Sequence, residues 1–568
     1  MKIKFCSHGL LTLLHIDEKI NINPAYFFLK KWYELHGKNP DLIWLDPGMI
    51  VFDSIDIVIK NIVQERPDVL GLGLYVWNYE LQYQIAKEVK QQLPDTIIVL
   101  GGTQLDVHKD FENGNQSTNY FKEHSYIDYV VYGDGEKPFQ QIIDYHGGFI
   151  ANKNNFVNII ENNQGQGKCY PYELLDDSLY LSQSPFLSQE DDMIRLRNYL
   201  NSRSIPNKNQ YWAIEFARGC MYSCTFCDWS QNLTKKVKRR THDWKQDLDL
   251  FCRLDVPIRE TDANFGQWPD DIKAFDYAIS LYDPTRNFSF TAMNTPKLKK
   301  DITEYLLLKN SLVYNMPPKI SIQDPMKDVL MAINRPSVPW TEISKMVKNL
   351  KDKLPIDMFR LTTMETILGL PEQTIDSVAE SYMNFFKLGI MSATYHLWHI
   401  LPNSPAADPK YQKFWGIKTK TIYEPFRFHL RESKFGAEFD ETWSPTTTKF
   451  ESLADLYYQL SQTNSDNSKR GSQGGFFKSN GMVVEHKKMT TVDMWAALRL
   501  KSHWHKLHRA FNLENRPLKN VKTMLIKLKN NSLKESNYQY QLHKEFIDKY
   551  NFIVWGRYDP TENKLFKF

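Results

Sequence analysis

The chain has 568 residues, of which 42% are hydrophobic and 24% are charged, and its formal net charge is +4. A length of this order corresponds to about three or four domains. The composition is that of an ordinary globular protein, which excludes global disorder, a collagen-like fibre and a coiled coil. The small, scattered net charge excludes a dedicated polyanion-binding protein. No apolar run approaches the ~20 residues that a membrane-spanning helix needs, so we expect no membrane partner.

The first block of the chain, residues 1–150, alternates strand-like and helix-like patterns. Val69–Leu74, Thr96–Leu100 and Ile127–Tyr132 predict buried parallel strands, and Tyr79–Leu93 has the spacing of a covering helix. The alternation predicts a Rossmann-like parallel sheet covered by helices. Glycines recur where these strands end, either because a ligand approaches that sheet edge or because the chain turns tightly there. These glycines are Gly71, Gly73, Gly101, Gly102, Gly133 and Gly135.

The remainder of the chain divides into a connector and two further blocks. Residues 151–208 predict a connector, which begins with a polar, Asn-rich surface linker at 151–163. Residues 209–405 repeat strand–helix units and predict a complete or partial (β/α) barrel, whose sites lie at the C-terminal ends of the strands. Its strand candidates lie near 211–216, 256–262, 287–292, 318–323, 357–367 and 392–400, and its helices near 269–282, 299–309, 340–353 and 373–388. Residues 406–568 predict a mostly helical region of unknown role.

Three of the six cysteines, Cys220, Cys224 and Cys227, fall within eight residues in the pattern C-x-x-x-C-x-x-C. This odd, tight group indicates metal ligation in a reducing compartment, so we expect a cytoplasmic protein. Three thiolates on one loop can hold three irons of a cubane [4Fe–4S] cluster and leave the fourth iron open to another ligand. A structural zinc site stays open as an alternative, and it would need His242 or Cys252 as a fourth ligand.

The cysteine segment Arg218–Trp229, with Phe226 just before the last cysteine, resembles the cluster motif of the radical S-adenosylmethionine (radical SAM) superfamily. Further segments resemble one subgroup, the cobalamin-binding radical SAM proteins: Ile258–Gly266, Lys319–Pro336, Glu365–Gln373 and Leu401–Pro405. Three earlier segments look like the cobalamin-binding Rossmann-like domain of that subgroup: Leu70–Trp77, Val99–Gln104 and Asp128–Glu136. The resemblance covers roughly residues 50–405 and does not reach the C-terminal block.

The resemblance implies three cofactors and a place for each. Cys220, Cys224 and Cys227 would ligate the [4Fe–4S] cluster, whose open iron would be chelated by S-adenosylmethionine (SAM). For SAM it implies Phe226, Asp262, Asn264, Ser321, Gln323 and Gly369, with Ser321 and Gln323 facing the ribose or the substrate. For cobalamin it implies Tyr75, Trp77 and Thr103 together with the six glycines of the sheet edge.

Several of these residues also have a purely structural interpretation. Asp262 and Asn264 could cap the next helix, Gln323 could be an ordinary loop residue, and Trp77 could belong to the core. Arg335 could pin a loop through a carboxylate. The sequence lacks the Asp-x-His-x-x-Gly motif whose histidine binds cobalt in many cobalamin domains, so the lower cobalt ligand is not specified.

The activity that the resemblance implies is a radical methylation. Reductive cleavage of SAM would give methionine and a 5′-deoxyadenosyl radical, and methylcobalamin would then methylate an unactivated carbon of a small-molecule or peptide substrate. A low-potential donor such as a flavodoxin or a ferredoxin would supply the electron. No residue is assigned as a catalytic acid, base or nucleophile.

Three other functions remain open at this point. The chain could be a radical SAM enzyme whose Rossmann-like domain does not bind cobalamin, or a non-catalytic metal-binding scaffold. It could also modify RNA through the basic stretch Lys235–Arg240, although a net charge of +4 gives nucleic acid little support.

Overall fold

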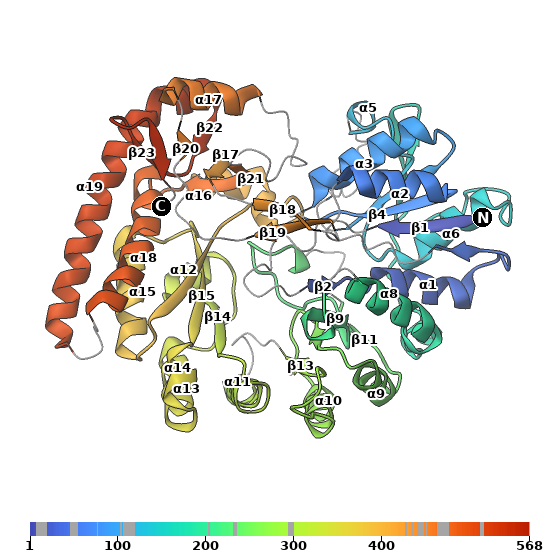
Figure 1. Cartoon of the computed structure of the whole chain (residues 1–568), viewed down its shortest axis with the longest axis horizontal. Coiled ribbons are helices and arrows are strands. Elements are labelled where there is room, and N and C mark those ends of the chain that lie inside the picture. Colours follow the sequence, from blue (N-terminus) through green and yellow to red (C-terminus); the bar gives the residue numbers. More distant parts are fainter. Residues whose placement is uncertain are drawn as a thin grey trace.

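The computed structural model describes residues 1–6, 20–45, 55–75, 78–102, 105, 120–202, 205–230, 236–292, 300–425, 429–433, 436–440, 448–449, 451–462, 476–511 and 516–566. In Figure 1 the N-terminal sheet lies on the right, an open arc of parallel strands with outer helices fills the lower middle, and the C-terminal region lies on the left. The fold class is the α/β organisation that the sequence predicts.

The N-terminal part is a seven-stranded sheet of order β3-β1-β4-β5-β6-β7-β8, in which β1 and β3–β6 are parallel. Helices α2 and α3 pack on one face of this sheet, and α1 and α6 pack on the other. The strands are β1 (Lys2–Cys6), β3 (Ile43–Trp44), β4 (Val69–Gly73), β5 (Ile97–Gly101), β6 (Tyr129–Val131), β7 (Ile159–Asn163) and β8 (Gln166–Cys169). The helices are α1 (Ala25–His36), α2 (Ile55–Glu65), α3 (Tyr79–Gln92), α5 (Tyr120–Glu123) and α6 (Glu136–His146).

Two features of the structure differ from the division into blocks that the sequence predicts. Residues 159–169 form the antiparallel pair β7–β8, which extends the first sheet where the sequence predicted the end of a polar linker and a connector. The buried residues Ile159 and Ile160 explain the difference, because two apolar residues suffice to anchor an edge strand inside an Asn-rich stretch. In addition, strand β2 (Ile20–Ile22) pairs in parallel with β9 (Gln210–Ile214), far along the chain. The domain limits themselves stay a prediction.

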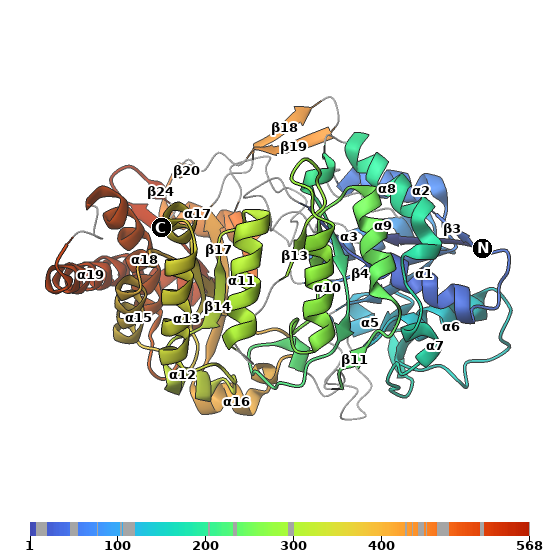
Figure 2. The same cartoon turned by 90° about the horizontal axis from the view of Figure 1, so that it is seen from below.

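The middle of the chain forms an open barrel from two parallel sheets, β13-β12-β9-β2 and β14-β15-β16. Its helices stand along the outside, as Figures 1 and 2 show. The strands after β9 are β12 (Ile258–Glu260), β13 (Phe290–Thr291), β14 (Lys319–Gln323), β15 (Thr363–Leu368) and β16 (Ser392–Leu397). The helices are α7 (Ser178–Leu181), α8 (Glu190–Ser202), α9 (Trp244–Leu254), α10 (Pro269–Ser280), α11 (Lys300–Tyr314), α12 (Lys327–Ala332), α13 (Trp340–Lys353), α14 (Ile356–Arg360) and α15 (Ile375–Lys387).

The barrel strands lie where the sequence predicts them, with one local exception. The predicted strand at 357–367 begins as helix α14, and β15 starts only at Thr363. Pro355 stands at the N-cap of α14, where the missing N–H of proline breaks no hydrogen bond of a helix that starts at Ile356.

The C-terminal region combines two long helices with short strands. Strand β17 lies between β21 and β22 in one sheet, β18 pairs with β19, and β24 lies between β20 and β23. The helices are α16 (Pro409–Trp415), α17 (Leu453–Gln462), α18 (Thr491–Phe511) and α19 (Leu518–Tyr550). The strands are β17 (Lys418–Pro425), β18 (His429–Ser433), β19 (Gly436–Asp440), β20 (Thr448–Lys449), β21 (Phe476–Glu485), β22 (Phe552–Val554), β23 (Arg557–Asp559) and β24 (Lys564–Phe566).

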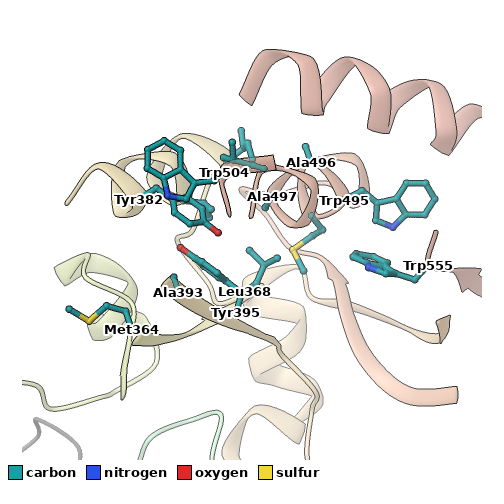
Figure 3. Packing of buried hydrophobic residues seen from close by; sticks show 14 of the residues in the cluster. Met364, Leu368, Tyr382, Ala393, Tyr395, Trp495, Ala496, Ala497, Trp504 and Trp555 are labelled. Atoms are coloured by element: carbon teal, nitrogen blue, oxygen red, sulfur yellow. The ribbon is translucent and has the colours of Figure 1, made fainter. Parts of the chain in front are cut away.

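Helix α18 covers the outer face of the second barrel sheet. Figure 3 shows Tyr395 of the barrel on the side of Trp504 of α18 and Leu368 below Ala497, while Trp495 of α18 lies beside Trp555. These residues belong to one buried cluster, so the C-terminal region is part of the barrel's own core. No described helix is long and apolar enough to cross a membrane.

Candidate functional site

The three clustered cysteines lie on a loop whose two ends are joined by strand pairing. Strand β10 (Ala217–Arg218) pairs with β11 (Lys238–Arg239), so the chain returns to its starting point after the cysteines. Gly219 opens the loop with a φ of +98°, a conformation that side chains rarely adopt. Cys220 and Cys224 are buried and Cys227 is half-buried. The loop therefore holds its thiols on the inner side, at the C-terminal end of barrel strand β9.

A buried arginine lies beside all three cysteines. The Arg335 side chain is only 5% exposed, and its guanidinium donates to the Ser321 carbonyl oxygen at 2.9 Å. Burial lowers the pKa of Arg335 to about 10, while the thiols of Cys224, Cys227 and Cys220 oppose the shift. Arg335 therefore lies beside the cysteines, and no carboxylate of the described residues forms an ion pair with it.

Asn264 also points at the cysteines, as its Nδ2 donates to the Cys220 Sγ at 3.2 Å. Asp262, two residues earlier, accepts from the Phe216 backbone N–H at 2.9 Å through Oδ1. Its Oδ2 is buried and has no hydrogen-bond partner among the described residues, and burial raises the pKa of Asp262 to about 8. Neither residue caps the next helix, because α10 starts at Pro269.

Gln323 lies at the end of β14, across the barrel mouth from β12. Its φ is +63°, and the β14–β15 register shifts between Ser321 and Gln323. The Gln323 Oε1 is buried without a partner among the described residues. The Asp262 Oδ2 and the Arg335 Nε, on other segments that border the cysteine loop, are likewise buried without a partner among the described residues. Buried polar groups of this kind usually have a partner, so a bound polar ligand fits here.

The other predicted SAM residues lie on neighbouring segments. Phe226 packs against an apolar cluster that contains Ile333 and Leu370. Gly369 has a φ of +98°, and a Cβ there would meet the Met494 side chain of α18 at 2.8 Å. The left-handed backbone itself therefore favours glycine here, because the methyl end of the flexible Met494 side chain can move aside.

Ser321 faces the barrel interior and donates to Glu365. Burial opposes ionisation of Glu365, but His396, Lys319 and Ser321 together lower its pKa to about 2. The interior of the second sheet therefore carries an ionised carboxylate next to the half-exposed cation Lys319.

The zinc alternative finds no support in the contacts of its candidate fourth ligands. His242 pairs with Asp247 at 2.6 Å between Nε2 and Oδ2. Cys252 accepts from Arg286 at 3.5 Å. Within the described part of the chain, no three His, Cys, Asp or Glu side chains converge on a single metal ion.

The C-terminal edge of the first sheet faces the barrel mouth and the C-terminal sheet. The Asn23 Nδ2 donates to the Tyr75 hydroxyl at 3.1 Å, next to barrel strand β2. The Asn403 Nδ2 donates to the Leu105 carbonyl at 3.1 Å, and the Asn480 Nδ2 donates to the Tyr79 hydroxyl at 3.1 Å. Three distant parts of the chain therefore meet at the edge where the sequence predicted the cobalamin residues. The predicted residues Trp77 and Thr103 lie outside the described residues.

The glycines of this edge have different roles in the structure. A Cβ at Gly71 would press on the rings of Phe5 and Phe139 at 3.1 Å, and one at Gly102, whose φ is +113°, would meet the Leu74 carbonyl oxygen at 2.2 Å. Gly101 is open, with its nearest atom 3.9 Å away. Three more glycines complete the set: Gly73 accepts from Asn78, Gly133 has a φ of +69°, and Gly135 precedes α6.

A buried charge network joins the first sheet to the cysteine loop, and the sequence interpretation missed it. The Arg218 NH1 donates to Glu136 at 2.7 Å and to Asp134 at 3.1 Å, and its Nε donates to Glu215 at 2.9 Å. Burial opposes ionisation of Glu215, but Arg218 and Arg240 hold its pKa below the usual range. The sequence signal that could have predicted this network is the pair of acids that follows β6, together with the arginine two residues before Cys220.

The basic stretch Lys235–Arg240, which the sequence offered as an RNA-binding segment, belongs largely to the same network. Each described cation in it has an acidic partner: Lys236 with Asp176, Lys238 with Asp134, Arg239 with Asp271 and Arg240 with Glu215. Lys238 and Arg240 are buried as well. These cations therefore support the loop and do not form an open phosphate-binding surface.

Comparison with known proteins finds one matching domain family and several similar proteins. Residues 49–143 match the family model described as "B12 binding domain". The chain is 26% identical to the cobalamin-dependent radical SAM methyltransferase TokK of Streptomyces tokunonensis over 62% of this chain and 50% of that protein. It is 24% identical to the 2-(S-pantetheinyl)-carbapenam-3-carboxylate methyltransferase of Streptantibioticus cattleyicolor over 63% of this chain and 51% of that protein.

The chain is similar to cobalamin-dependent radical SAM methyltransferases, and its N-terminal part matches a B12-binding domain. This finding confirms the resemblance seen in the cysteine loop and the first sheet. The chain spans about half the length of these two curated relatives.

The fold of this family also appears among solved structures. The radical SAM methyltransferase TsrM of Kitasatospora setae, solved with cobalamin and a [4Fe–4S] cluster bound, superposes with a TM-score of 0.52 at 14% identity. The superposition covers 73% of this chain and 77% of TsrM. At this identity the likeness shows the fold alone.

Proposed function

We propose that the chain is a cobalamin-dependent radical SAM enzyme that methylates an unactivated carbon of a small-molecule or peptide substrate. The observation that carries the proposal is the group of three cysteines around Arg335 at the mouth of the open barrel. The matched B12-binding domain adds the second cofactor site. The two relatives described as methyltransferases support methyl transfer as the reaction class.

Cys220, Cys224 and Cys227 would hold the [4Fe–4S] cluster. When bound, that cluster supplies the electron for reductive cleavage of SAM. Around it, the chain contributes two positive or hydrogen-donating groups: the guanidinium of Arg335 and the amide of Asn264 on the Cys220 sulfur. Charge and hydrogen bonds at the sulfurs set the reduction potential of such a site, and both groups favour the gain of an electron.

SAM would be held by the unpartnered polar atoms next to the cysteines. The Asp262 Oδ2 and the Gln323 Oε1 are acceptors that suit the amino and ribose groups of this ligand. Phe226 closes the apolar side beside Leu370. Because these groups sit on rigid strand ends, they orient the ligand and exclude water without moving themselves.

Cobalamin would lie on the C-terminal edge of the first sheet, where Gly101 is open and Tyr75 reaches the barrel. The substrate would then bind between this edge and the barrel interior, next to Ser321 and Glu365. A pocket between domains is the usual place for a reaction that needs two separate cofactors.

Anaerobic purification with cobalamin supplied, followed by iron, sulfide and cobalt analysis, tests the proposal. About four irons and one cobalt per chain are expected. Incubation with SAM and dithionite should then release methionine and 5′-deoxyadenosine. Zinc without iron would refute the assignment.

A second candidate is a radical SAM enzyme that does not use cobalamin. One observation favours it: Gly71 and Gly102 are explained by packing against Phe5, Phe139 and Leu74, so they do not require a ligand. Four irons without cobalt, together with SAM cleavage, would select this candidate.

A further inference from the structure

Two short helices form the outer surface behind the cysteine loop. The backbone N–H of Thr225 donates to the Ile333 carbonyl at 2.9 Å, just after α12. The Tyr411 hydroxyl of α16 lies 2.9 Å from the Thr225 Oγ1 and donates to the Ala332 carbonyl at 3.3 Å. Figure 2 shows α12 and α16 next to each other at the lower edge of the molecule. A molecule bound on these helices would therefore stand one layer away from the cysteines.

The centre of this surface is apolar. Met331 on α12 is 66% exposed and Phe414 on α16 is 62% exposed, more than any other large hydrophobic residue in the described part of the chain. Met221, on the cysteine loop itself, is 50% exposed. Single exposed hydrophobic residues are common, but the two most exposed ones beside one functional loop mark an interaction surface.

Lysines surround this centre. We name as the α12–α16 surface the residues Met331, Phe414, Lys327, Lys410, Lys413 and Lys487. All four lysines are exposed, and the Lys487 Nζ lies 4.7 Å from the Phe414 ring centroid. None of the four forms an ion pair with a carboxylate of the described residues. The exposed acids here are Asp328 and Asp408, and Asp408 is engaged in capping α16, so the surface carries an excess of positive charge.

The proposed function demands an electron from outside the chain. Reductive cleavage of SAM consumes one electron, and the sequence provides a single cysteine group. The other cysteines, Cys6, Cys169 and Cys252, are isolated in the sequence and do not form a second cluster motif. The electron must therefore enter from a separate molecule that binds near the cysteine loop.

We propose that the α12–α16 surface docks an acidic protein that carries a one-electron redox group, an inference that rests on the proposed function. The donor loses one electron and the iron–sulfur site gains it; no bond forms or breaks and no proton moves in this transfer. The lysines steer an acidic partner, and Met331 with Phe414 provide the apolar contact at the centre.

The test compares two reductants on the same holoenzyme. The double variant K410E/K413E reverses two charges of the α12–α16 surface. With flavodoxin hydroquinone as the probe at low salt, kcat/KM for SAM cleavage should fall about tenfold or more. With dithionite, which needs no docking surface, the rate should stay that of the wild type. Titration calorimetry with flavodoxin should show a matching loss of affinity, independent of turnover.

A matched control changes the same charges elsewhere. Lys519 and Lys522 are exposed on α19, in a segment, Leu518–Lys534, that itself contains no acidic residue. K519E/K522E should leave the flavodoxin kinetics unchanged. An equal loss in this control would show non-specific attraction and overturn the inference.

Phe414→Ala separates the apolar centre from the charges. It should weaken flavodoxin binding while the dithionite rate remains that of the wild type. If the wild type cleaves SAM with dithionite but both surface variants keep normal flavodoxin kinetics, the docking surface is refuted and the proposed function stands. If the wild type fails to cleave SAM with dithionite, the proposed function itself fails.

Discussion

Replacing Glu136 by Gln tests the charge network that joins the first sheet to the cysteine loop. Glu136 is 3% exposed, and its Oε1 accepts from the Arg218 NH1 at 2.7 Å and from the Tyr180 hydroxyl at 3.0 Å. The network balances three acids with three bases: Asp134, Glu136 and Glu215 with Arg218, Lys238 and Arg240. The substitution keeps the size of the side chain and leaves the buried network with one positive charge in excess.

The expected cost follows from the burial of the pair. Removing one partner of a buried ion pair typically costs about 3–5 kcal/mol. Arg218 keeps Asp134 at 3.1 Å and Glu215 at 2.9 Å, and the Phe28 ring lies 5.3 Å below its guanidinium. We therefore expect the lower end of that range, about 3 kcal/mol in the free energy of unfolding.

Equilibrium urea unfolding, followed by tryptophan fluorescence, measures this loss. Iron content should fall as well, because Arg218 lies two residues before Cys220. Glu173→Gln is the matched control: Glu173 pairs with Lys137 at 2.6 Å, but both side chains are well exposed, so a loss below about 1 kcal/mol is expected. Equal effects of the two variants would refute the idea that the buried network holds the loop.

Three further predictions address the loop, the sheet edge and the C-terminal core. Cys224→Ala should abolish iron and sulfide binding while the first sheet stays folded by circular dichroism; unchanged iron would contradict the cluster assignment. Gly102→Ala should cost about 2 kcal/mol or more in thermal unfolding, because its Cβ would meet the Leu74 carbonyl at 2.2 Å, whereas Gly101→Ala should cost less than about 0.5 kcal/mol. Burial lowers the pKa of His543 to about 3 from 6.5, so the unfolded state binds its proton first and stability falls as the pH drops below 6.5. Between pH 7 and pH 4.5 this histidine should account for about 3 kcal/mol of the loss seen in urea unfolding, and His543→Leu should remove that part.

The strand–helix alternation was predictable because its signal is local. A parallel strand covered on both faces is a continuous apolar run, and Val69–Leu74 is such a run. Strand β2 could not be found in this way, since Ile20–Ile22 is short and its partner β9 lies almost 200 residues away. Strand β7 was missed because Asn and Glu residues surround the two isoleucines that anchor it.

The residues of the candidate site also differ in whether a local sequence pattern predicts them. The cysteine spacing is a local pattern, so the loop could be identified from the sequence alone. The roles of Arg335 and Asn264 depend on contacts that cross 40 to 110 residues, and no spacing rule reports such contacts. Gly102 also has a structural reason to be glycine, because a Cβ there would meet the backbone of Leu74, and its role toward a ligand stays a prediction.

The buried network adds charge pairing to the apolar cluster that joins Phe5 and Phe28 to Phe216, just before the loop. Apolar surfaces tolerate small sliding movements, whereas Arg218 can satisfy Glu136, Asp134 and Glu215 together in only one arrangement. A reaction shared by two cofactor sites loses rate steeply when the sites shift by an ångström or so. Ionic groups cost desolvation energy when they are buried, so their use here fits a requirement for fixed geometry more than one for stability. The Gly133–Glu136 segment, which the sequence suggested only as a ligand edge, therefore also sets the position of the cysteines relative to that edge.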